Sequence, residues 1–280
     1  MSKINNNKCI ICGHEMRFHF QKDFFTNANF AKMADSIVPV QYYECSQCGF
    51  LSSITHKNLL PEKWIKLNDD FHHYNEMENR AGIGINQPPY AEQAMMLEIL
   101  IRNNIIDGND ILDYAAGYGS LSRILKKYYG RKINCYDKYV TDASFNYIDE
   151  INGSTWSVII NSAMFEHVLN RNDLDDVNNL VSDNGALLIH TVVVDFIPKD
   201  PSWFYIDIPV HTAVHTNRSM SILMEQWNYK SSIYSPRSKT WVLLKKPYKD
   251  VKPIIDNINK ELQTEWLYGK DGFMDYWKAN

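Results

Sequence analysis

The sequence predicts an α/β protein with a doubly wound parallel sheet and a small cysteine-bearing module in front of it. Short apolar strand patterns alternate with helical patterns between residues 111 and 194, as in a parallel sheet with helices on both faces. Two C-x-x-C-G pairs lie within the first 49 residues, and apolar runs flank a "PRSK" turn at 236–239. The last of these patterns predicts an antiparallel hairpin that closes the sheet.

Each expected element rests on its own pattern of apolar residues and helix or turn signals. Pro88 and Pro89 precede an apolar stripe at helical spacing, and Gly130 ends the helix after the first strand. In chain order, the expected elements are a helix from near Tyr90, a strand over 111–114, a helix over 120–130, strands over 132–137 and 156–161, a helix over 174–185, a strand over 186–194 and the hairpin strands over 230–235 and 240–246.

The composition is that of a soluble globular protein. The chain has 280 residues, of which 45% are hydrophobic and 22% are charged, with a formal net charge of -4. Its Lys and Arg residues are scattered among acids, which does not favour a nucleic-acid partner. No run of residues reaches the roughly 18 apolar positions of a membrane span, and the N-terminus lacks the apolar core of a signal peptide. We therefore expect a cytoplasmic protein without membrane contact.

Four of the five cysteines form the two C-x-x-C-G pairs. Two residues between the ligands let one tight turn aim both thiolates at one ion, and the following glycine accepts the backbone angles of that turn. The pairs predict a closed structural zinc site with the ligands Cys9, Cys12, Cys45 and Cys48. The alternatives are a redox C-x-x-C, which needs only one pair, and a chance pairing of buried thiols; the fifth cysteine, Cys135, is expected in the core.

Three parts of the chain are expected. They are a zinc-binding module over 1–60, a linking segment over 61–89 and the main α/β domain over 90–280. The linking segment is rich in polar and aromatic residues, so it can act as a lid whose His72, His73 and Tyr74 reach a bound ligand. A solvated linker is the alternative.

The stretch "ILDYAAGYGSL" at 111–121 predicts a ligand site. A strand, a loop of small residues and a helix from near Ser120 bring backbone close to a ligand at the carboxyl end of a sheet, and Gly117 and Gly119 leave room for it. Asp137 ends the next strand, 24 positions after Asp113, where a carboxylate can accept both hydroxyls of a ribose. A cofactor that contains a nucleoside is therefore expected.

The loop has no third glycine in the first turn of the helix, so it is a poor cradle for a pyrophosphate. Its order, Asp113 followed by Ala115, Gly117 and Gly119, instead resembles motif I of the class I S-adenosylmethionine (SAM) dependent methyltransferases. "WSVIINSAMFEHVLN" is similar to the fourth strand and following loop of that family, "GALLIHTVVV" to its fifth strand, and the final hairpin to its reversed last strand. The resemblance covers roughly residues 88 to 246.

The resemblance implies a cofactor site. Asp137 would hold the ribose hydroxyls, Lys138 would border the adenine, Asn161 would lie beneath the reacting centre, and Tyr74 is a candidate to reach the cofactor. The methionine part and the ribose would be surrounded by Asp113, Ala115, Gly117 and Gly119. The assignment of the loop requires that Ala115, which replaces the usual first glycine, keeps a negative φ, and the third strand and its preceding helix are expected to be reduced.

A four-cysteine module joined to such a domain is similar to sugar methyltransferases of bacterial deoxysugar, capsule and lipopolysaccharide pathways. Members that methylate carbon usually carry a further C-terminal domain, whereas here a helical tail is expected after residue 246. The resemblance thus favours methyl transfer to a hydroxyl of a sugar, with a nucleotide-linked sugar as the expected substrate. The alternatives are an N- or C-methyltransferase of an amino or keto sugar, and a zinc-ribbon binding protein with a methyltransferase-like scaffold.

A sugar hydroxyl needs a base to accept its proton as the new bond forms. The histidines expected near the carboxyl ends of the strands are His167, His190, His211 and His215. The first choice for the general base is His215, with His211 or His167 next, and each can instead be a hydrogen-bonded core residue. Glu166 with His167 can alternatively bind a divalent ion, as similar residues do in some O-methyltransferases of quinone synthesis.

Overall fold

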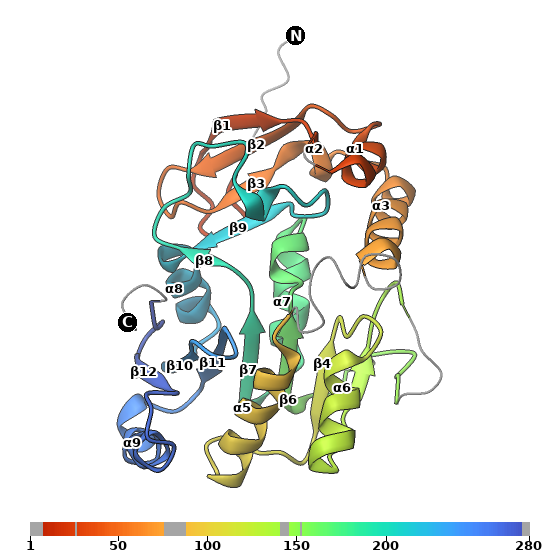
Figure 1. Cartoon of the computed structure of the whole chain (residues 1–280). Coiled ribbons are helices and arrows are strands. Elements are labelled where there is room, and N and C mark those ends of the chain that lie inside the picture. The colour runs from red at the N-terminus through yellow and green to blue at the C-terminus, as the bar shows by residue number, and fades with distance from the viewer. Residues whose placement is uncertain (1–7, 26, 76–87, 141–145, 152, 276–280) are drawn as a thin grey trace.

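The computed structural model describes residues 8–25, 27–75, 88–140, 146–151 and 153–275. Two sheets make up the molecule, and in Figure 1 the smaller one lies above the larger one. The larger sheet carries the predicted α/β domain, and the smaller one begins with the cysteine-bearing module.

The larger sheet has seven strands in the order β12-β10-β11-β7-β6-β4-β5. β4, β5, β6 and β7 are parallel, and the reversed strand β11 lies between β7 and β10. This arrangement confirms the doubly wound sheet with an antiparallel last strand. Its strands are β4 (Ile111–Tyr114), β5 (Asn134–Tyr136), β6 (Trp156–Ser162), β7 (Val181–His190), β10 (Ser231–Ser235), β11 (Thr240–Leu244) and β12 (Tyr268–Asp271).

Successive residues of each strand point to opposite faces of this sheet, and apolar residues on both faces pack against helices. Ile111 and Leu188 pack with α5, α6 and α9, whereas Leu112 and Leu187 pack with α7 and α8 on the other face. The helical elements of this domain are α5 (Tyr90–Arg102), α6 (Ser120–Ile124), η2 (Leu125–Tyr129), η3 (Phe165–His167), α7 (Arg171–Asn179), η4 (Phe204–Ile206), α8 (Asn217–Gln226), η5 (Tyr248–Asp250) and α9 (Lys252–Glu261).

The smaller sheet is built from two distant parts of the chain. Its order is β1-β2-β3-β9-β8, where β8 and β9 come from the segment that follows β7. In Figure 1 this segment crosses from the lower sheet to the upper one. The strands are β1 (Met16–Lys22), β2 (Val40–Cys45), β3 (Leu51–Ser53), β8 (Val193–Val194) and β9 (Ala213–Thr216).

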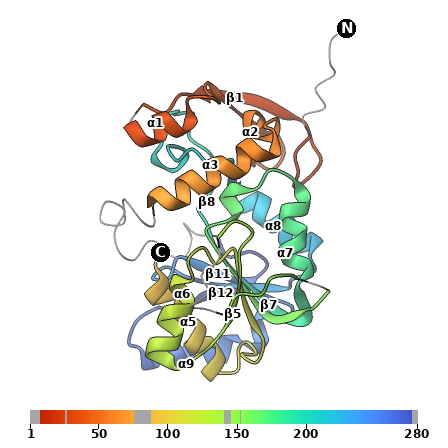
Figure 2. The same cartoon turned by 90° about the vertical axis from the view of Figure 1, so that its right-hand side faces the viewer.

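The cysteine-bearing module also contains three helices. They pack with the small sheet around buried aromatic side chains, including Phe24, Tyr42 and Trp64. Figure 2 shows α3 along the side of the molecule between the two sheets. The helices are α1 (Ala28–Ala34), α2 (Ile54–Lys57) and α3 (Pro61–His73), so the described part of the predicted linking segment is largely helical; residues 76–87 of it lie outside the described residues.

Some boundaries differ from the sequence-based expectations. The helix expected over 174–185 begins at Arg171, because Asn170 and Asp173 form a capping box, and β7 already begins at Val181. The strand expected over 186–194 ends at His190, and its last two residues join the small sheet as β8. The third strand is reduced to a parallel bridge between Cys135 and Tyr147, as expected. The helical tail is followed by β12.

No described helix combines the length and the apolar character that a membrane span requires.

The second cysteine turn is joined to β9 by direct contacts. The hydroxyl of Thr216 donates to the carbonyl of Cys48 and also accepts from the amide of Ser219, which caps α8. A Cβ added at Gly49 would lie 3.0 Å from Cγ2 of Thr216, whereas one at Gly13, the equivalent position of the first turn, would meet nothing within 4 Å. Both glycines have positive φ, +70° and +75°.

This pair of glycines provides a matched test of the contact. Both Gly13→Ala and Gly49→Ala are expected to destabilise the fold by about 1 kcal/mol, because an alanine strains a left-handed backbone. Gly49→Ala is expected to cost about 1 kcal/mol more, since its methyl group presses on Thr216. Urea denaturation of both variants measures the difference; equal losses would contradict the packing of the second turn against β9.

Candidate functional site

A cavity of about 670 Å³ lies at the carboxyl ends of the four parallel strands. The last residues of β4, β5, β6 and β7 all line it, namely Tyr114, Tyr136, Ser162 and His190. The chain leaves β4 for β5 on one side and returns to β6 on the other, so this edge contains the topological switch point where ligands of doubly wound sheets bind. The opposite wall comes from α3 and from residues 204–211.

The loop after β4 lines the cavity with backbone and small side chains. Ala115 and Gly117 face it, with φ of 61° and 54°, and Gly119 precedes α6 with φ of 70°. The expectation that Ala115 keeps a negative φ is therefore wrong, and the condition we attached to the loop assignment is not met. The reason is geometric: the turn into α6 uses a left-handed backbone at all three positions, which a non-glycine residue adopts only with strain.

Asp137 joins the loops after β4 and β5. Its Oδ2 accepts from the amide of Gly117 at 2.9 Å, and its Oδ1 accepts from the amides of Tyr139 and Val140 at 2.8 and 3.0 Å. The carboxylate lines the cavity, so its remaining lone pairs can accept hydrogen bonds from a ligand. The next residue, Lys138, also lines the cavity.

Three of the predicted cofactor residues are not on the cavity wall. Asp113 and Asn161 are buried, and neither they nor Gly119 are among the residues that line the cavity. Asn161 donates to the carbonyl of Tyr114 at 3.2 Å and so supports the end of β4. Burial, and then the charge of Asp137, raises the pKa of Asp113 to about 8.

The predicted lid residues differ in their positions. His72 lines the cavity, whereas Tyr74 packs edge-on against Phe30, with ring centroids 5.8 Å apart, and is not among the lining residues. Tyr74 therefore does not face the cavity in this structure, because its ring lies toward α1. His73 is exposed.

A cluster of histidines lines part of the cavity. The ring of His167 stacks on that of His72 with centroids 5.9 Å apart and meets that of His211 edge-on at 5.2 Å. The side-chain ligand atoms of Glu166, His167 and His211 all lie within 4.8 Å of one another. Burial raises the pKa of Glu166 to about 7 and lowers that of His211 to about 4.

His215 lies outside this cluster. It is fully buried in β9, where its ring packs against Phe50 and Phe165 and its Nε2 donates to the carbonyl of Phe165 at 3.2 Å. It is not among the residues that line the cavity. Our first choice of general base therefore does not fit the structure: His211, four residues earlier, precedes the strand and faces the cavity.

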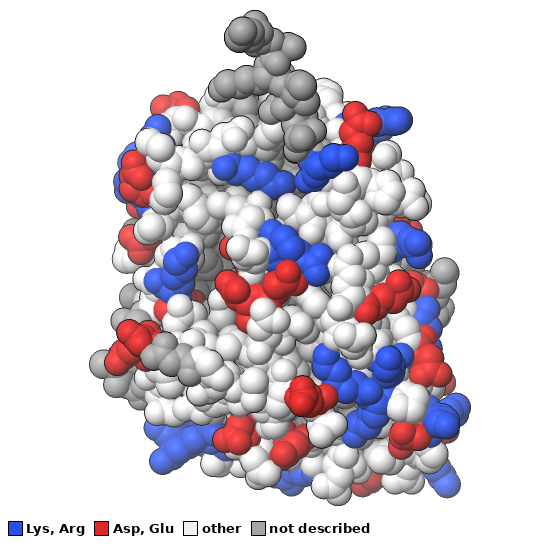
Figure 3. Space-filling view, turned by 180° about the vertical axis from the view of Figure 1, so that it is seen from behind, with Lys and Arg blue, Asp and Glu red and all other residues white. Residues whose placement is uncertain are grey.

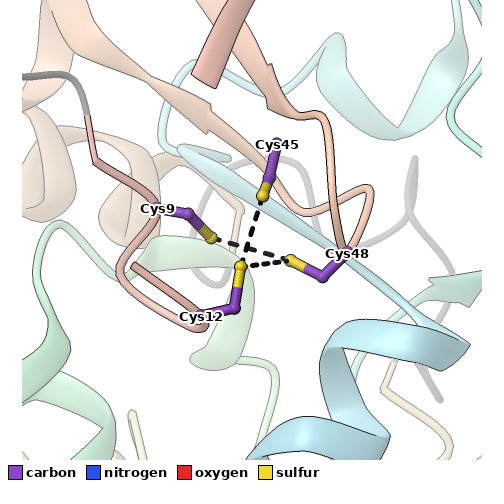
Figure 4. Close-up of side chains that lie close together, drawn as sticks. All are labelled: Cys9, Cys12, Cys45 and Cys48. Atoms are coloured by element: carbon purple, nitrogen blue, oxygen red, sulfur yellow. Dashed lines mark hydrogen bonds between the residues drawn. The ribbon is translucent and has the colours of Figure 1, made fainter. Parts of the chain in front are cut away.

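The four predicted zinc ligands come together (Figure 4). Sulfur-to-sulfur distances are 3.6 Å for Cys9 and Cys48, 3.4 Å for Cys12 and Cys45, and 3.6 Å for Cys12 and Cys48. Four thiolates at 2.3 Å from one zinc ion would lie about 3.8 Å apart, so the cluster fits a tetrahedral site after a small expansion. Cys135 is buried in β5, as expected for a core thiol.

Several residues of the site were not found from the sequence. The Tyr147 hydroxyl donates to the carbonyl of Gly117 and so supports the loop from the reduced third strand. Trp64 and Asn68 of α3 form part of the cavity wall. Helical spacing on α3 was a signal for a buried face, but nothing local indicates that this face lies opposite the ends of the parallel strands.

No model of a known protein family matches the sequence, and no curated protein matches it. Solved structures with partial similarity include methyltransferases. The plantazolicin methyltransferase BpumL, in complex with a triazolic desmethylPZN analog and SAH, is 11% identical, with 66% of this chain and 92% of that chain covered and a TM-score of 0.42. The magnesium protoporphyrin IX methyltransferase ChlM from Synechocystis, with bound SAH, is 15% identical, with 64% and 97% covered and a TM-score of 0.40.

A further similar structure is the complex between the Haloferax volcanii Trm112 methyltransferase activator and the putative methyltransferase. It is 11% identical, with 63% of this chain and 98% of that chain covered and a TM-score of 0.44.

The strain at Ala115 can be measured against its neighbour. Ala115→Gly is expected to leave stability unchanged or to raise it by up to about 1 kcal/mol, because glycine adopts the left-handed backbone without strain. Ala116→Gly, at a buried position that is not left-handed, is expected to lose about 1 kcal/mol. Chemical denaturation compares the two; equal losses would show that Ala115 is not strained.

The buried carboxyl of Asp113 predicts a pH dependence of stability. Its pKa of about 8 in the folded state lies above the usual pKa of 3.8, so its contribution to stability is complete below about pH 4 and is lost as pH rises through 8. The free energy of unfolding of the wild type should therefore fall between about pH 5 and pH 8, relative to Asp113→Asn. Urea denaturation across this range checks the sign; a rising difference would contradict it.

Proposed function

We propose that the protein is a SAM-dependent methyltransferase. The observation that carries this proposal is the cavity at the switch point, formed by the ends of four parallel strands in a sheet whose strand β11, next to β7, is reversed. Asp137 and the loop after β4 lie together there, as the resemblance to class I methyltransferases requires for a nucleoside cofactor. The strained backbone at Ala115 does not support the assignment of the loop after β4 as a cofactor loop. The proposal therefore rests on the strand order and on Asp137.

The charge of the cavity supports a cationic cofactor. Carboxyl groups outnumber cationic side chains among the described lining residues, and the methyl donor SAM carries a positive sulfonium. The carboxyl groups are Asp137, Glu166, Asp173 and Asp176, and the cations are Arg123 and Lys138.

For the acceptor, we propose a hydroxyl of a sugar, with a nucleotide-linked sugar of surface polysaccharide synthesis as the first candidate. Aromatic side chains, among them Trp64, Phe204 and Tyr205, line the cavity and would offer faces on which a sugar ring can stack. The Glu166, His167 and His211 cluster provides the groups that can assist the loss of the hydroxyl proton as the methyl group is transferred in line. Methylation of an amine or carbon of such a sugar is an outcome of the same test.

We also propose that the four cysteines bind one structural zinc ion. Four ligands complete a tetrahedral site, so the ion would stabilise the two cysteine turns and take no part in the methyl transfer.

On the face shown in Figure 3, Lys and Arg side chains lie among Asp and Glu side chains. A surface of mixed charge gives no particular support for a nucleic-acid acceptor on that face.

The proposal predicts cofactor binding that depends on Asp137. Calorimetric titration should give binding of SAM and of S-adenosylhomocysteine, and Asp137→Asn should weaken both by about tenfold or more, because a charged acceptor is lost. Asp149→Asn, which changes an exposed aspartate, is the matched control and should bind as the wild type does.

Turnover of a panel of nucleotide sugars, with the methylated atom located by NMR, identifies the acceptor. His211→Ala should abolish turnover and leave cofactor affinity nearly unchanged. Failure of the wild type to bind either cofactor would contradict the proposed function.

A further inference from the structure

Glu166, His167 and His211 come from two distant parts of the chain. Glu166 and His167 lie on η3, directly after β6, and His211 lies 44 residues after His167, just before β9. Their ligand atoms lie within 4.8 Å of one another on the wall of the cavity. Ligands bound at 2.0–2.2 Å to one ion are separated by about 3 to 4 Å, so small side-chain movements bring these three atoms to ligand distances.

Groups around the cluster orient two of these side chains. Nδ1 of His211 donates to the backbone carbonyl of Tyr205, so in the neutral ring Nε2 carries the lone pair. Oε2 of Glu166 accepts from the hydroxyl of Thr191 at 2.9 Å, and that hydroxyl also lies 3.1 Å from the hydroxyl of Tyr205. A histidine that donates its other N–H to a carbonyl, and a carboxylate held by a hydroxyl, are the usual surroundings of metal ligands.

We propose that Glu166, His167 and His211 bind one divalent first-row transition-metal ion at the acceptor end of the cavity. Two imidazoles and one carboxylate suit such ions and leave coordination positions on the cavity side for water or for an oxygen of the acceptor. That the acceptor supplies this oxygen rests on the proposed function; the metal site itself does not. This site is distinct from the four-cysteine cluster, whose thiolates select a softer ion.

The difference between the two ligand sets provides the test. Protein that carries one zinc ion per chain, with excess zinc removed, is titrated with Mn²⁺, which suits imidazole and carboxylate ligands, and the loss of the free-ion signal in electron paramagnetic resonance gives the number bound. About one Mn²⁺ per chain is expected, beside one zinc that remains at the cysteines. Glu166→Gln and His211→Asn should each lower Mn²⁺ affinity by about tenfold or more, and Thr191→Val, which removes the supporting hydroxyl, by about 10- to 100-fold.

His73→Asn changes an exposed histidine at the end of α3 and is the matched control, with unchanged Mn²⁺ affinity. Retained zinc and an unchanged thermal transition identify the variants that remain folded. No Mn²⁺ binding by the wild type, or equal affinity in the wild type and in folded Glu166→Gln and His211→Asn variants, would overturn the site.

Titration of the same samples with S-adenosylhomocysteine separates this inference from the proposed function. Cofactor binding without Mn²⁺ binding would refute only the metal site. Mn²⁺ binding that depends on Glu166 and His211, without cofactor binding, would support the metal site and refute the proposed function.

Discussion

The pairing of β9 with β3 is the constraint on which the functional site depends. Through this antiparallel pair, the segment that follows β7 of the large sheet joins the small sheet of the cysteine-bearing module. The segment just before it is held by buried hydrogen bonds from that module: Tyr42 donates to the carbonyl of His211 at 2.8 Å, and His56 donates to that of Pro209 at 2.9 Å. At about 1 kcal/mol each, such bonds favour one position for His211 at the cavity wall.

The cysteine turns are also bonded to the main domain. Arg171, at the start of α7, donates to the carbonyls of Ile10 and Ile11 in the first turn, and Gln226, at the end of α8, donates to that of Ile11. Carbonyls in a tight turn have few partners inside the turn, so these side chains satisfy them from the main domain. The module is thus bonded to both helices on one face of the large sheet, and it forms the cavity wall together with the sheet.

Local patterns located the features whose residues are close in sequence, but they did not predict the positive φ of Ala115 or the burial of Asp113. Each of these features combines a short motif with an adjacent strand or turn. They are the small residues after β4, the two cysteine turns and Asp137 directly after β5.

The assignment of His215 as the general base failed because the position of its segment is set by strand pairing with a distant part of the chain. The spacing of four residues between His211 and His215 does not show which of them faces the cavity. β9 begins only at Ala213, and its partner strand β3 ends at Ser53, 160 residues before that. Such non-local pairing has no signature within the segment itself.

The backbone conformation of two alanines at the edge of the cavity also depends on contacts with the surrounding structure. Ala115 and Ala163 follow β4 and β6, which are neighbours in the sheet, and both have positive φ, 61° and 66°. Both line the cavity, and a left-handed alanine persists only where neighbouring contacts determine the backbone. For Ala163 one such contact is its amide, which donates to the carbonyl of His190 at 2.9 Å. A larger side chain in either position would project from a strained backbone beside the cavity, so alanine meets the requirement for space while restricting the loop more than glycine would.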